Sequence, residues 1–447
     1  MRFSELDGAR IGVWGAGREV RAFAAQLARR LPGASIRAVV FDVIPEGDVR
    51  TALGAPQARI ASAADALAAL SDCELVVRSP GVSAHRAELV ALRAAGVPVT
   101  TATSLWLAEQ GGEGVIGVTG TKGKSTTAAL AFQLACAAGH SVRLAGNIGA
   151  PAIELLDGEA ADVVVLELSS YQIADLECGP EVALVTNLFR EHTDWHGSEE
   201  VYRADKLRLL ALPGVRVAVL NSRSEPLTEA AVGAGVTLAS YGVPNGWDVT
   251  ARGIELHGEL ALARADLPLP GEHNALNLCG ALTALAAAGV PAPPLAQALR
   301  GFQALPHRLE TVADHDGVLW VDDSISTTPE STLAALASYP EREIVLIAGG
   351  QDRGQDYSGL ASELARREAA LVGLPSTGAR LVAAARTAGV APARAIETSG
   401  MERAVASARE LSQPGAVILL SPAAPSYDHY RDFEDRGERF RALIEPS

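Results

Sequence analysis

The sequence predicts an α/β protein with parallel sheets, organised as three domains. Short apolar runs alternate along the chain with Ala- and Leu-rich stretches of helical length, a pattern typical of strand–helix–strand units. At 447 residues the chain is also too long for one hydrophobic core. We expect a Rossmann-like domain at 1–109, a central P-loop domain at 110–303 and a second Rossmann-like domain at 304–447. Gly111-Gly112 and the Leu305-Pro306 turn are the predicted hinges.

The strands are predicted where apolar runs are short and bounded by polar or Gly-containing segments. In the first domain the expected strands are Arg10–Trp14, Arg37–Phe41 and Leu75–Val77. In the second domain they are Gly114–Thr119, Asp162–Leu168, Val182–Thr186 and Val215–Leu220, with a helix at Ser125–Ala138. In the third domain they are Val318–Val321, Glu343–Ala348 and Ala416–Leu420.

Composition excludes several classes of protein. The formal net charge of −15 argues against a general nucleic-acid binder, which needs a basic surface. The longest apolar stretch, Ala128–Ala138, is too short to cross a bilayer, and the N-terminus lacks the apolar segment of a signal peptide. We therefore expect a cytoplasmic protein with no nucleic-acid or membrane partner. We also expect a monomer, although the sequence does not reveal the oligomeric state. The scattered cysteines form no C-x-x-C pair, so we expect core residues: Cys73, Cys136, Cys178 and Cys279.

A Gly-rich turn follows the strand Gly114–Thr119 and opens the next helix. Its sequence is Thr119-Gly-Thr-Lys-Gly-Lys-Ser-Thr-Thr127. In this context backbone N–H groups and a helix N-terminus bind phosphates, and a lysine such as Lys124 contacts the β- and γ-phosphates. The common G-x-x-x-x-G-K-[ST] spacing is not met, because Val118 stands five before Gly123. We predict ATP binding by Gly120, Thr121, Lys122, Gly123, Lys124, Ser125 and Thr126.

Two side chains beyond later strands are candidate metal ligands. Phosphoryl transfer from ATP needs divalent ions to spread charge. Glu167 ends an apolar run, so its carboxylate is expected at the carboxyl end of a strand, where open α/β sheets bind ligands. His192 lies just beyond the strand Val182–Thr186. Ser125 or Thr126 offers a hydroxyl to the same Mg²⁺.

Taken together, these motifs resemble the Mur ligase family, in particular its MurD-like, glutamate-adding branch. The resemblance covers nearly the whole chain and keeps the order of the family's motifs. Besides the phosphate loop, the matching segments are Gly146–Gly149, Glu167–Gln172, Thr186-Asn187, Glu191-His192, Ala204–Leu207, Gly271–Asn277, Leu305–Arg308, Asp322–Ser324, Gly349-Gly350 and Leu420–Ala423.

The resemblance implies an ATP-dependent ligase of peptidoglycan precursor synthesis, which adds glutamate to UDP-N-acetylmuramoyl-L-alanine through an acyl phosphate. It implies one Mg²⁺ at Glu167 and Ser125 or Thr126, and a second at His192 and Lys206. A protonated lysine has no lone pair for a metal. In the family the matching lysine is carbamylated by CO₂, which implies the same for Lys206. Lys124, His192 and Lys206 are thus the implied catalytic residues.

Further nucleotide contacts are implied by the resemblance. Asn277 is expected near the adenine, Arg308 at the phosphates and Asp323 at the ribose hydroxyls. Asn147 is expected to position phosphate and substrate. Without the family, the two asparagines also fit turn-closing residues, and Arg308 and Asp323 also fit surface ion pairs.

The N-terminal segment carries part of a dinucleotide fingerprint. Gly15 and Gly17 follow an apolar run, but Val20 stands where the third glycine belongs. Asp42 follows the second strand and can accept from ribose hydroxyls or a uracil edge. A hydride-transfer enzyme is the rival interpretation, and it leaves the rest of the chain unexplained. The resemblance implies that this domain holds the UDP group, with the loop at Ser79 beside it.

The expected glutamate pocket departs from the family's D-glutamate pattern. Ile325 stands in place of one lysine and Arg353 in place of another, whereas Thr327, Ser426 and Phe433 match. Arg353 can grip a carboxylate in a planar, bidentate manner. The carboxylates of glutamate would then be held in a different arrangement. Residues 324–329 also resemble the branch of the family that adds L-glutamate. We therefore favour L-glutamate and keep D-glutamate as the alternative.

Three other interpretations stay open on the sequence alone. A folylpolyglutamate-synthetase-like ligase also adds glutamate, although its loop usually has Asn before Gly-Lys-Gly. A P-loop switch would hydrolyse ATP without an amino acid. An inactive paralogue is disfavoured by the intact Lys124, Glu167, His192 and Lys206.

Overall fold

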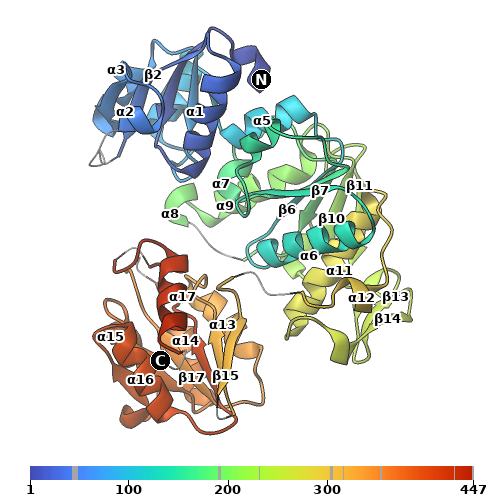
Figure 1. Ribbon diagram of the computed structural model, residues 1–447, viewed down its shortest axis with the longest axis vertical. Helices are drawn as coiled ribbons and strands as arrows, with labels where there is room; N and C mark the ends of the chain where they lie inside the picture. Colours follow the sequence, from blue (N-terminus) through green and yellow to red (C-terminus); the bar gives the residue numbers. More distant parts are fainter. Residues whose placement is uncertain are drawn as a thin grey trace. The chain divides into compact units, whose positions relative to one another are not determined.

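The computed structural model describes residues 1–42, 49–189, 193–230, 232–302, 306–315, 317–352, 355–426 and 428–444. The chain forms two compact units. The first comprises Met1–Leu267 and His273–Arg300, and the second comprises Pro268–Glu272 and Gly301–Ser447. Both are of the α/β class with mainly parallel sheets, as predicted (Figure 1). The boundaries proposed at 109/110 and 303/304 stay predictions.

The N-terminal sheet of the first unit is parallel, with strand order β3-β2-β1-β4-β5. This 3-2-1-4-5 order is that of a Rossmann-like sheet. Its strands are β1 Arg10–Trp14, β2 Ser35–Phe41, β3 Arg59–Ser62, β4 Leu75–Arg78 and β5 Val99–Thr100. Its helices are α1 Arg18–Arg30, α2 Val49–Ala52, α3 Ala66–Leu70, α4 Ala87–Ala94 and α5 Ala102–Gln110.

The central sheet of the same unit is also parallel, with order β11-β10-β9-β6-β8-β7. Strand β6 lies between β8 and β9, so the strand order reverses around it. Ligands bind at such a switch point, outside the carboxyl ends of the strands. The strands are β6 Val115–Thr119, β7 Val142–Gly146, β8 Val163–Glu167, β9 Val182–Val185, β10 Val217–Asn221 and β11 Thr237–Tyr241.

The helices of the central region are α6 Lys124–Ala137, α7 Ser170–Ile173, α8 Thr193–His196, α9 Glu199–Leu207, α10 Glu225–Thr228, α11 Glu272–Ala287 and α12 Leu295–Ala298. A small antiparallel sheet that the sequence pattern did not predict follows β11. Its strands are β12 Trp247–Val249, β13 Gly253–Leu256 and β14 Glu259–Ala263.

The second unit is built on one sheet of order β15-β16-β20-β17-β18-β19, in which only β15 is antiparallel to its neighbour. Its strands are β15 Glu310–His315, β16 Val318–Asp322, β17 Ile344–Ala348, β18 Ala370–Gly373, β19 Ala395–Glu397 and β20 Val417–Leu420. Its helices are α13 Pro329–Ala337, α14 Ser358–Arg366, α15 Gly378–Ala388, α16 Met401–Leu411 and α17 Phe433–Ala442.

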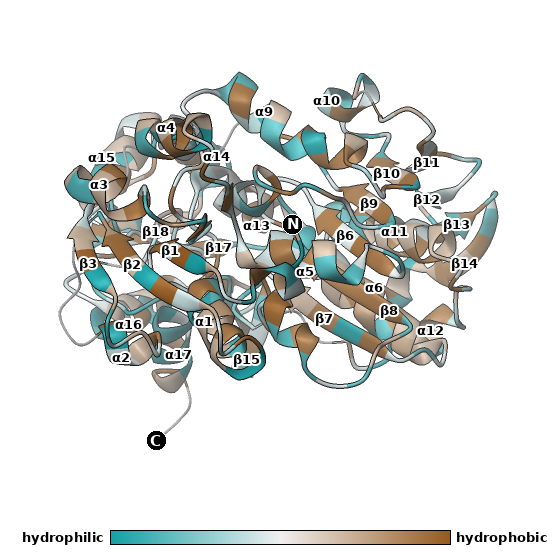
Figure 2. Cartoon of the chain, turned by 90° about the horizontal axis from the view of Figure 1, so that it is seen from above, coloured by the Kyte–Doolittle hydropathy of each residue, from teal (hydrophilic) through white to brown (hydrophobic). Residues whose placement is uncertain are grey.

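Helices on both faces of the sheets explain the continuous apolar runs. In β17, Ile344, Leu346 and Ala348 pack into one core, while Val345 and Ile347 pack into the core on the opposite face. A strand buried on both sides cannot alternate apolar with polar residues. Figure 2 shows the same continuous apolar colouring along β9.

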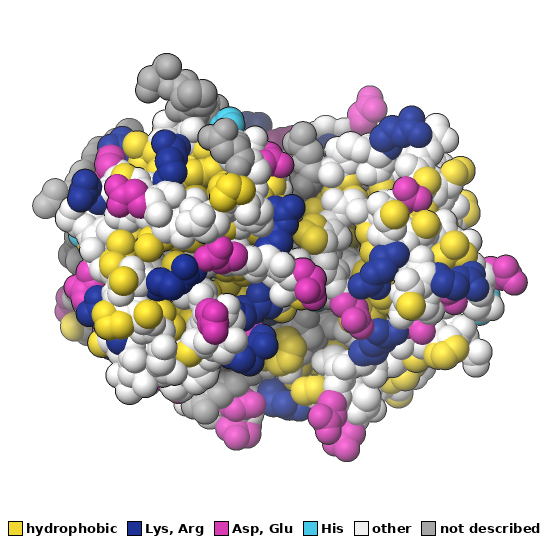
Figure 3. Space-filling view, turned by 90° about the horizontal axis from the view of Figure 1, so that it is seen from below, with side chains coloured by type: hydrophobic (Ala, Val, Ile, Leu, Met, Phe, Trp, Pro, Cys, Tyr) yellow, Lys and Arg dark blue, Asp and Glu magenta, His cyan; other side chains and the backbone are white. Residues whose placement is uncertain are grey.

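On the face shown in Figure 3, basic and acidic side chains are interspersed among the described residues. Within the described part of the chain, no helix has the length and apolarity needed to span a membrane.

The four cysteines were expected in the core. This expectation is wrong for Cys136 of α6, which is exposed, and Cys178 is only half-buried.

Candidate functional site

The phosphate loop joins β6 to α6 at the switch point of the central sheet. Gly120 and Gly123 have φ values of +146° and +81°. Gly123 is the N-cap of α6 and offers no side chain to the first turn of the helix. Backbone N–H groups at such a helix start can bind an anion.

Neighbouring side chains approach both glycines so closely that no larger residue fits. A Cβ atom on Gly120 would lie 1.9 Å from Thr186 Oγ1. A Cβ atom on Gly123 would lie 2.4 Å from Asn277 Oδ1. Asn277, on α11, therefore lies against the loop at Gly123.

The segment after β9 supports the loop from the side. Thr186 Oγ1 donates to the carbonyl oxygen of Lys122 at 2.6 Å. The side chain of Asn187 accepts from Lys122 N at 2.8 Å and donates to Lys122 O at 3.0 Å. Thr121 Oγ1 lies 2.7 Å from the hydroxyl of Tyr202 on α9. Sequence reasoning gave these supporting residues no role, although Thr186-Asn187 was among the matching segments.

The basic side chains of the predicted site lie at this loop. Lys124 Nζ donates to Thr121 O at 2.9 Å. Lys206, on α9, is buried, and its Nζ donates to Gly120 O at 2.9 Å. Its Nζ also lies 5.1 Å from the ring centroid of Tyr202. Lys206 is therefore a buried lysine whose side-chain nitrogen lies at the loop. Ser125 and Thr126 are buried in the first turn of α6.

Glu167 is the last residue of β8, directly beside β6. It pairs with Val118 on one side and Gly146 on the other. The side chain is completely buried, and Oε1 accepts from Asn147 Nδ2 at 2.8 Å. Oε2 is buried without a hydrogen-bond partner among the described residues. A buried carboxylate oxygen left without a donor is suited to a cation. The residues present thus fit the implied Mg²⁺.

The N-terminal candidates lie together at the end of β1. A Cβ atom on Gly15 would lie 2.8 Å from Ser79 Cβ, and one on Gly17 would lie 2.7 Å from Ser79 Oγ. Asp42 follows β2, and its Oδ1 accepts from Arg86 at 2.8 Å. The Arg86 guanidinium also lies 4.8 Å from the ring centroid of Trp14.

Asn147 is the exception among the expected UDP contacts. Its side chain binds Glu167, and its carbonyl oxygen accepts from Arg18 at 3.0 Å. Arg18 also donates to the carbonyl oxygens of Gly146 and Gly149, both at 3.1 Å. The start of α1 is thereby tied to the turn that carries Asn147. Sequence reasoning missed Arg18, which carries no signal beyond its place after Gly17.

The predicted residues of the second unit surround the segment after β16. Asp323 is buried, and its carboxylate accepts from Ser421 Oγ at 2.7 Å and Leu309 N at 3.2 Å. Burial raises the pKa of Asp323 to about 6, against the opposing effect of these hydrogen bonds. Arg308 is half-buried, and its Nε has no hydrogen-bond partner in the described part of the chain.

Residues around the expected amino-acid pocket are fixed by Arg436, which sequence reasoning missed. Arg436 is fully buried on α17 and donates to Ser324 Oγ at 3.0 Å, Ser324 O at 2.8 Å and Ala424 O at 3.1 Å. Phe433 O accepts from Ser324 Oγ at 2.8 Å. Ser426 is buried, whereas Thr327 is half-buried. Burial lowers the pKa of Arg436 to about 10.

Comparison with known proteins decides the family. Residues 118–285 match the Mur ligase middle domain, and residues 307–424 match the Mur ligase, glutamate ligase domain. A Micromonospora sp. protein named UDP-N-acetylmuramoyl-L-alanine--L-glutamate ligase is 43% identical, covering 99% of this chain and 98% of the relative. The chain belongs to the Mur ligase family. It is accordingly an ATP-dependent amino-acid ligase.

Other relatives of this Mur ligase agree. A Xanthomonas euvesicatoria protein of the same name is 41% identical over 99% of this chain and 96% of its own length. The structure of MurF ligase from Thermotoga maritima in complex with ADP is similar with a TM-score of 0.59 and 16% identity, covering 99% of this chain and 96% of that one. That likeness supports the fold alone.

Two predicted residues of this Mur ligase, His192 and Arg353, lie outside the described residues. Among the others, Lys124, Lys206 and Asn277 lie at the phosphate loop, and Glu167 lies on the neighbouring strand. Gly15, Gly17 and Ser79 lie together after β1. Ser324, which follows Asp323, is hydrogen-bonded to Phe433 at the start of α17.

Proposed function

We propose that the protein joins L-glutamate to UDP-N-acetylmuramoyl-L-alanine, with ATP hydrolysed to ADP and phosphate. The observation that carries this proposal is the unpartnered, buried Oε2 of Glu167 on the strand next to the phosphate loop. A divalent cation held by this carboxylate would neutralise the charge of the phosphates that the loop is proposed to bind. The full-length relatives supply the substrate names.

ATP binding is proposed for residues 120–126, with Asn277 against the loop at Gly123. Arg308 and Asp323 of the second unit are proposed to contact the same nucleotide. The unpartnered Nε of Arg308 leaves a donor for a phosphate oxygen.

Glu167, with Ser125 or Thr126, would hold one Mg²⁺, and His192 with carbamylated Lys206 would hold a second. These ions supply charge neutralisation for the transferring phosphoryl group. The burial of Lys206 against Gly120 O supports the carbamate, because it places the lysine nitrogen beside the phosphate loop. A carbamate replaces the ammonium by two oxygens that can bind a cation.

The chemistry proceeds in two displacements. A carboxylate oxygen of the alanyl group attacks the γ-phosphorus of ATP, the bond to the β-phosphate oxygen breaks, and ADP leaves. The amine of glutamate then attacks the acyl carbon, loses a proton and expels inorganic phosphate. Lys124, at the start of α6, stabilises the negative charge on the phosphoryl oxygens in the first displacement.

The UDP group is proposed to bind at the carboxyl end of the N-terminal sheet. Gly15 and Gly17 pack closely on Ser79, so the glycine turn after β1 and the loop at Ser79 lie side by side at this end of the sheet. Asp42 and its partner Arg86 lie at the end of the neighbouring strand. Asn147, bound to Glu167, is proposed to position the reacting end of this substrate.

Glutamate is proposed to bind at Thr327, Arg353, Ser426 and Phe433. Ile325 is half-buried and cannot contribute an ammonium to either carboxylate. Arg436 also fixes the backbone at Ser324. A small shift of this segment therefore cannot bring another side chain to the place of the absent lysine. The carboxylates must therefore be held by other groups, which is what a change of stereochemistry requires.

The test is turnover of UDP-N-acetylmuramoyl-L-alanine with ATP, Mg²⁺ and each glutamate enantiomer, with mass analysis of the product. We expect the mass of one added glutamate and a strong preference for the L form. Preference for D-glutamate would overturn the stereochemical assignment. Phosphate release that needs no glutamate would indicate a nucleotide switch and overturn the ligase.

A further inference from the structure

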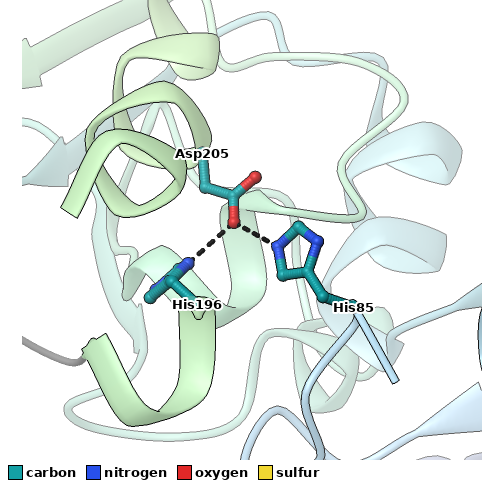
Figure 4. A group of neighbouring side chains, drawn as sticks. All are labelled: His85, His196 and Asp205. Carbon is teal, nitrogen blue, oxygen red and sulfur yellow. Dashed lines mark hydrogen bonds and ion pairs between the residues drawn. The ribbon is translucent and has the colours of Figure 1, made fainter. Parts of the chain in front are cut away.

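A cluster of two histidines and one aspartate includes one residue of α9. His85 Nε2 and His196 Nδ1 lie 2.6 Å and 2.7 Å from the same oxygen, Asp205 Oδ2 (Figure 4). The possible ligand atoms all lie within 4.8 Å of one another. His85 comes from the segment between β4 and α4, while His196 ends α8 and Asp205 lies in α9.

Two of these side chains are held rigidly. His196 is buried, and its Nε2 lies 2.9 Å from Ser170 Oγ. Its ring packs against Trp195 and Tyr202, with ring centroids 4.4 Å and 5.2 Å away. The side chain of Asp205 is only 13% exposed. Neither can move far without disturbing α8 and α9.

His85 is the open side of the cluster. Its side chain is 41% exposed, so an ion can enter from solvent on this side. Its ring touches Trp195 edge-on, with centroids 5.7 Å apart. Two fixed ligands, His196 and Asp205, and one ligand that can adjust, His85, are suited to an ion that exchanges with solvent.

Without a metal, the two imidazoles each donate one N–H to Asp205. A divalent ion takes the place of those two protons. His85 can carry its proton on the solvent-facing Nδ1, while His196 can carry its own on Nε2 and donate it to Ser170 Oγ. Metal-bound histidines usually donate their other N–H to an oxygen in this way.

A bound metal needs a different spacing of the three ligand atoms. Ligands at about 2.0–2.1 Å from a tetrahedral ion lie about 3.3 Å apart. Each histidine nitrogen must therefore move about half an ångström or more away from Asp205 Oδ2, and the two nitrogens, which lie within 4.8 Å of each other, must also reach this spacing. The exposed His85 can supply most of this movement. Two imidazole nitrogens and one carboxylate oxygen suit Zn²⁺ or a similar transition metal, whereas Mg²⁺ prefers oxygen ligands.

We propose that His85, His196 and Asp205 form a binding site for one divalent transition-metal ion of the Zn²⁺ type, with water at a fourth position. The site uses none of the residues proposed to hold Mg²⁺, and it does not depend on the proposed function. It joins the segment after β4 to α8 and α9. Metal binding therefore cross-links the N-terminal sheet region to the central region, and it stiffens the helix that carries Lys206.

The test uses the full chain without nucleotide, titrated with Zn²⁺ against a chromophoric chelator. We expect one tight equivalent, unaffected by millimolar Mg²⁺. His85→Ala and Asp205→Asn should each weaken Zn²⁺ binding ~10-fold or more, since even second-sphere partners contribute that much. The matched control, His315→Ala, removes an exposed histidine of β15 and should leave the affinity unchanged.

Two further readouts make the result independent of catalysis. Co²⁺ should give the visible absorption of a four- or five-coordinate site and quench the fluorescence of Trp195, which lies beside His196. Zn²⁺ should raise the melting temperature of the unchanged chain but not of His85→Ala. Circular dichroism verifies that each variant is folded. Unaltered Zn²⁺ affinity in folded His85→Ala and Asp205→Asn would overturn the site.

Discussion

The Nζ atom of Lys206 lies 2.9 Å from the carbonyl oxygen of Gly120, so a buried hydrogen bond ties α9 to the phosphate loop. The same helix holds the loop a second time, through the hydroxyl pair of Tyr202 and Thr121. Carbamylation or substitution of Lys206 would therefore change a hydrogen bond of the phosphate loop directly.

Lys206→Ala should lower the rate of ADP formation by ~100-fold or more, the usual cost of losing one electrostatic stabiliser. A short added carboxylate that enters the space left by the side chain should restore part of the rate, because it supplies the oxygens of the proposed carbamate. Arg203→Ala, on the same helix, is the control and should retain activity. Full activity of Lys206→Ala without any additive would refute the role of the lysine.

Glu167→Gln should separate activity from stability. The substitution removes a buried charge whose Oε2 has no partner, so the melting temperature without Mg²⁺ should hold or rise. Mg²⁺-dependent ADP formation should fall ~100-fold or more. Scanning calorimetry and a coupled ADP assay measure the two effects. If stability and activity fell together, Glu167 would be a structural residue only.

Gly123→Ala should weaken ATP binding, because the added methyl group would displace Asn277 as well as strain the backbone. Its Cβ would lie 2.4 Å from Asn277 Oδ1, on a φ of +81°. Gly139, with a φ of +90° and open space around the Cβ position, is the matched control. Both alanines carry the backbone cost of about 1–3 kcal/mol. Only Gly123→Ala should also weaken ATP binding, measured by calorimetry, and equal effects would argue against the contact.

Asp323 should make the second unit less stable as pH rises. Its folded pKa of about 6 lies above the unfolded value, so the folded state binds the proton more tightly and loses stability between those two pKa values. Asp323→Asn cannot titrate. The stability of the unchanged chain relative to this variant should therefore fall by about 1–2 kcal/mol from pH 5 to pH 7.

Urea unfolding at both pH values measures this difference. Asp314→Asn, an exposed position in β15, is the control and should show no such trend. A relative stability of Asp323→Asn that is constant with pH would contradict the raised pKa.

The parts of the fold that could be predicted are those set by local pattern. Strand β6, the glycine turn and helix α6 follow from an apolar run, two glycines and a helical stretch in succession. Glu167 was expected at the end of its strand and is the last residue of β8. The antiparallel strands β12–β14 were missed, because short half-exposed strands lack the long apolar runs of the buried ones.

The parts of the site that could not be predicted depend on contacts between distant residues. The burial of Lys206 results from packing against Gly120 and Tyr202, which no local pattern near Asp205 reveals. Asn147 binds Glu167 because β7 and β8 are neighbours in the sheet, a pairing that the sequence does not specify. Arg436 lies 112 residues from Ser324, whose backbone it fixes.

The central claim is that the phosphate loop activates a carboxylate as an acyl phosphate. The most direct test supplies UDP-N-acetylmuramoyl-L-alanine labelled with ¹⁸O in its carboxylate, together with ATP, Mg²⁺ and L-glutamate. Since one carboxylate oxygen attacks phosphorus and leaves with it, mass analysis should find one ¹⁸O atom in each inorganic phosphate formed. Product formation with unlabelled phosphate would contradict the account.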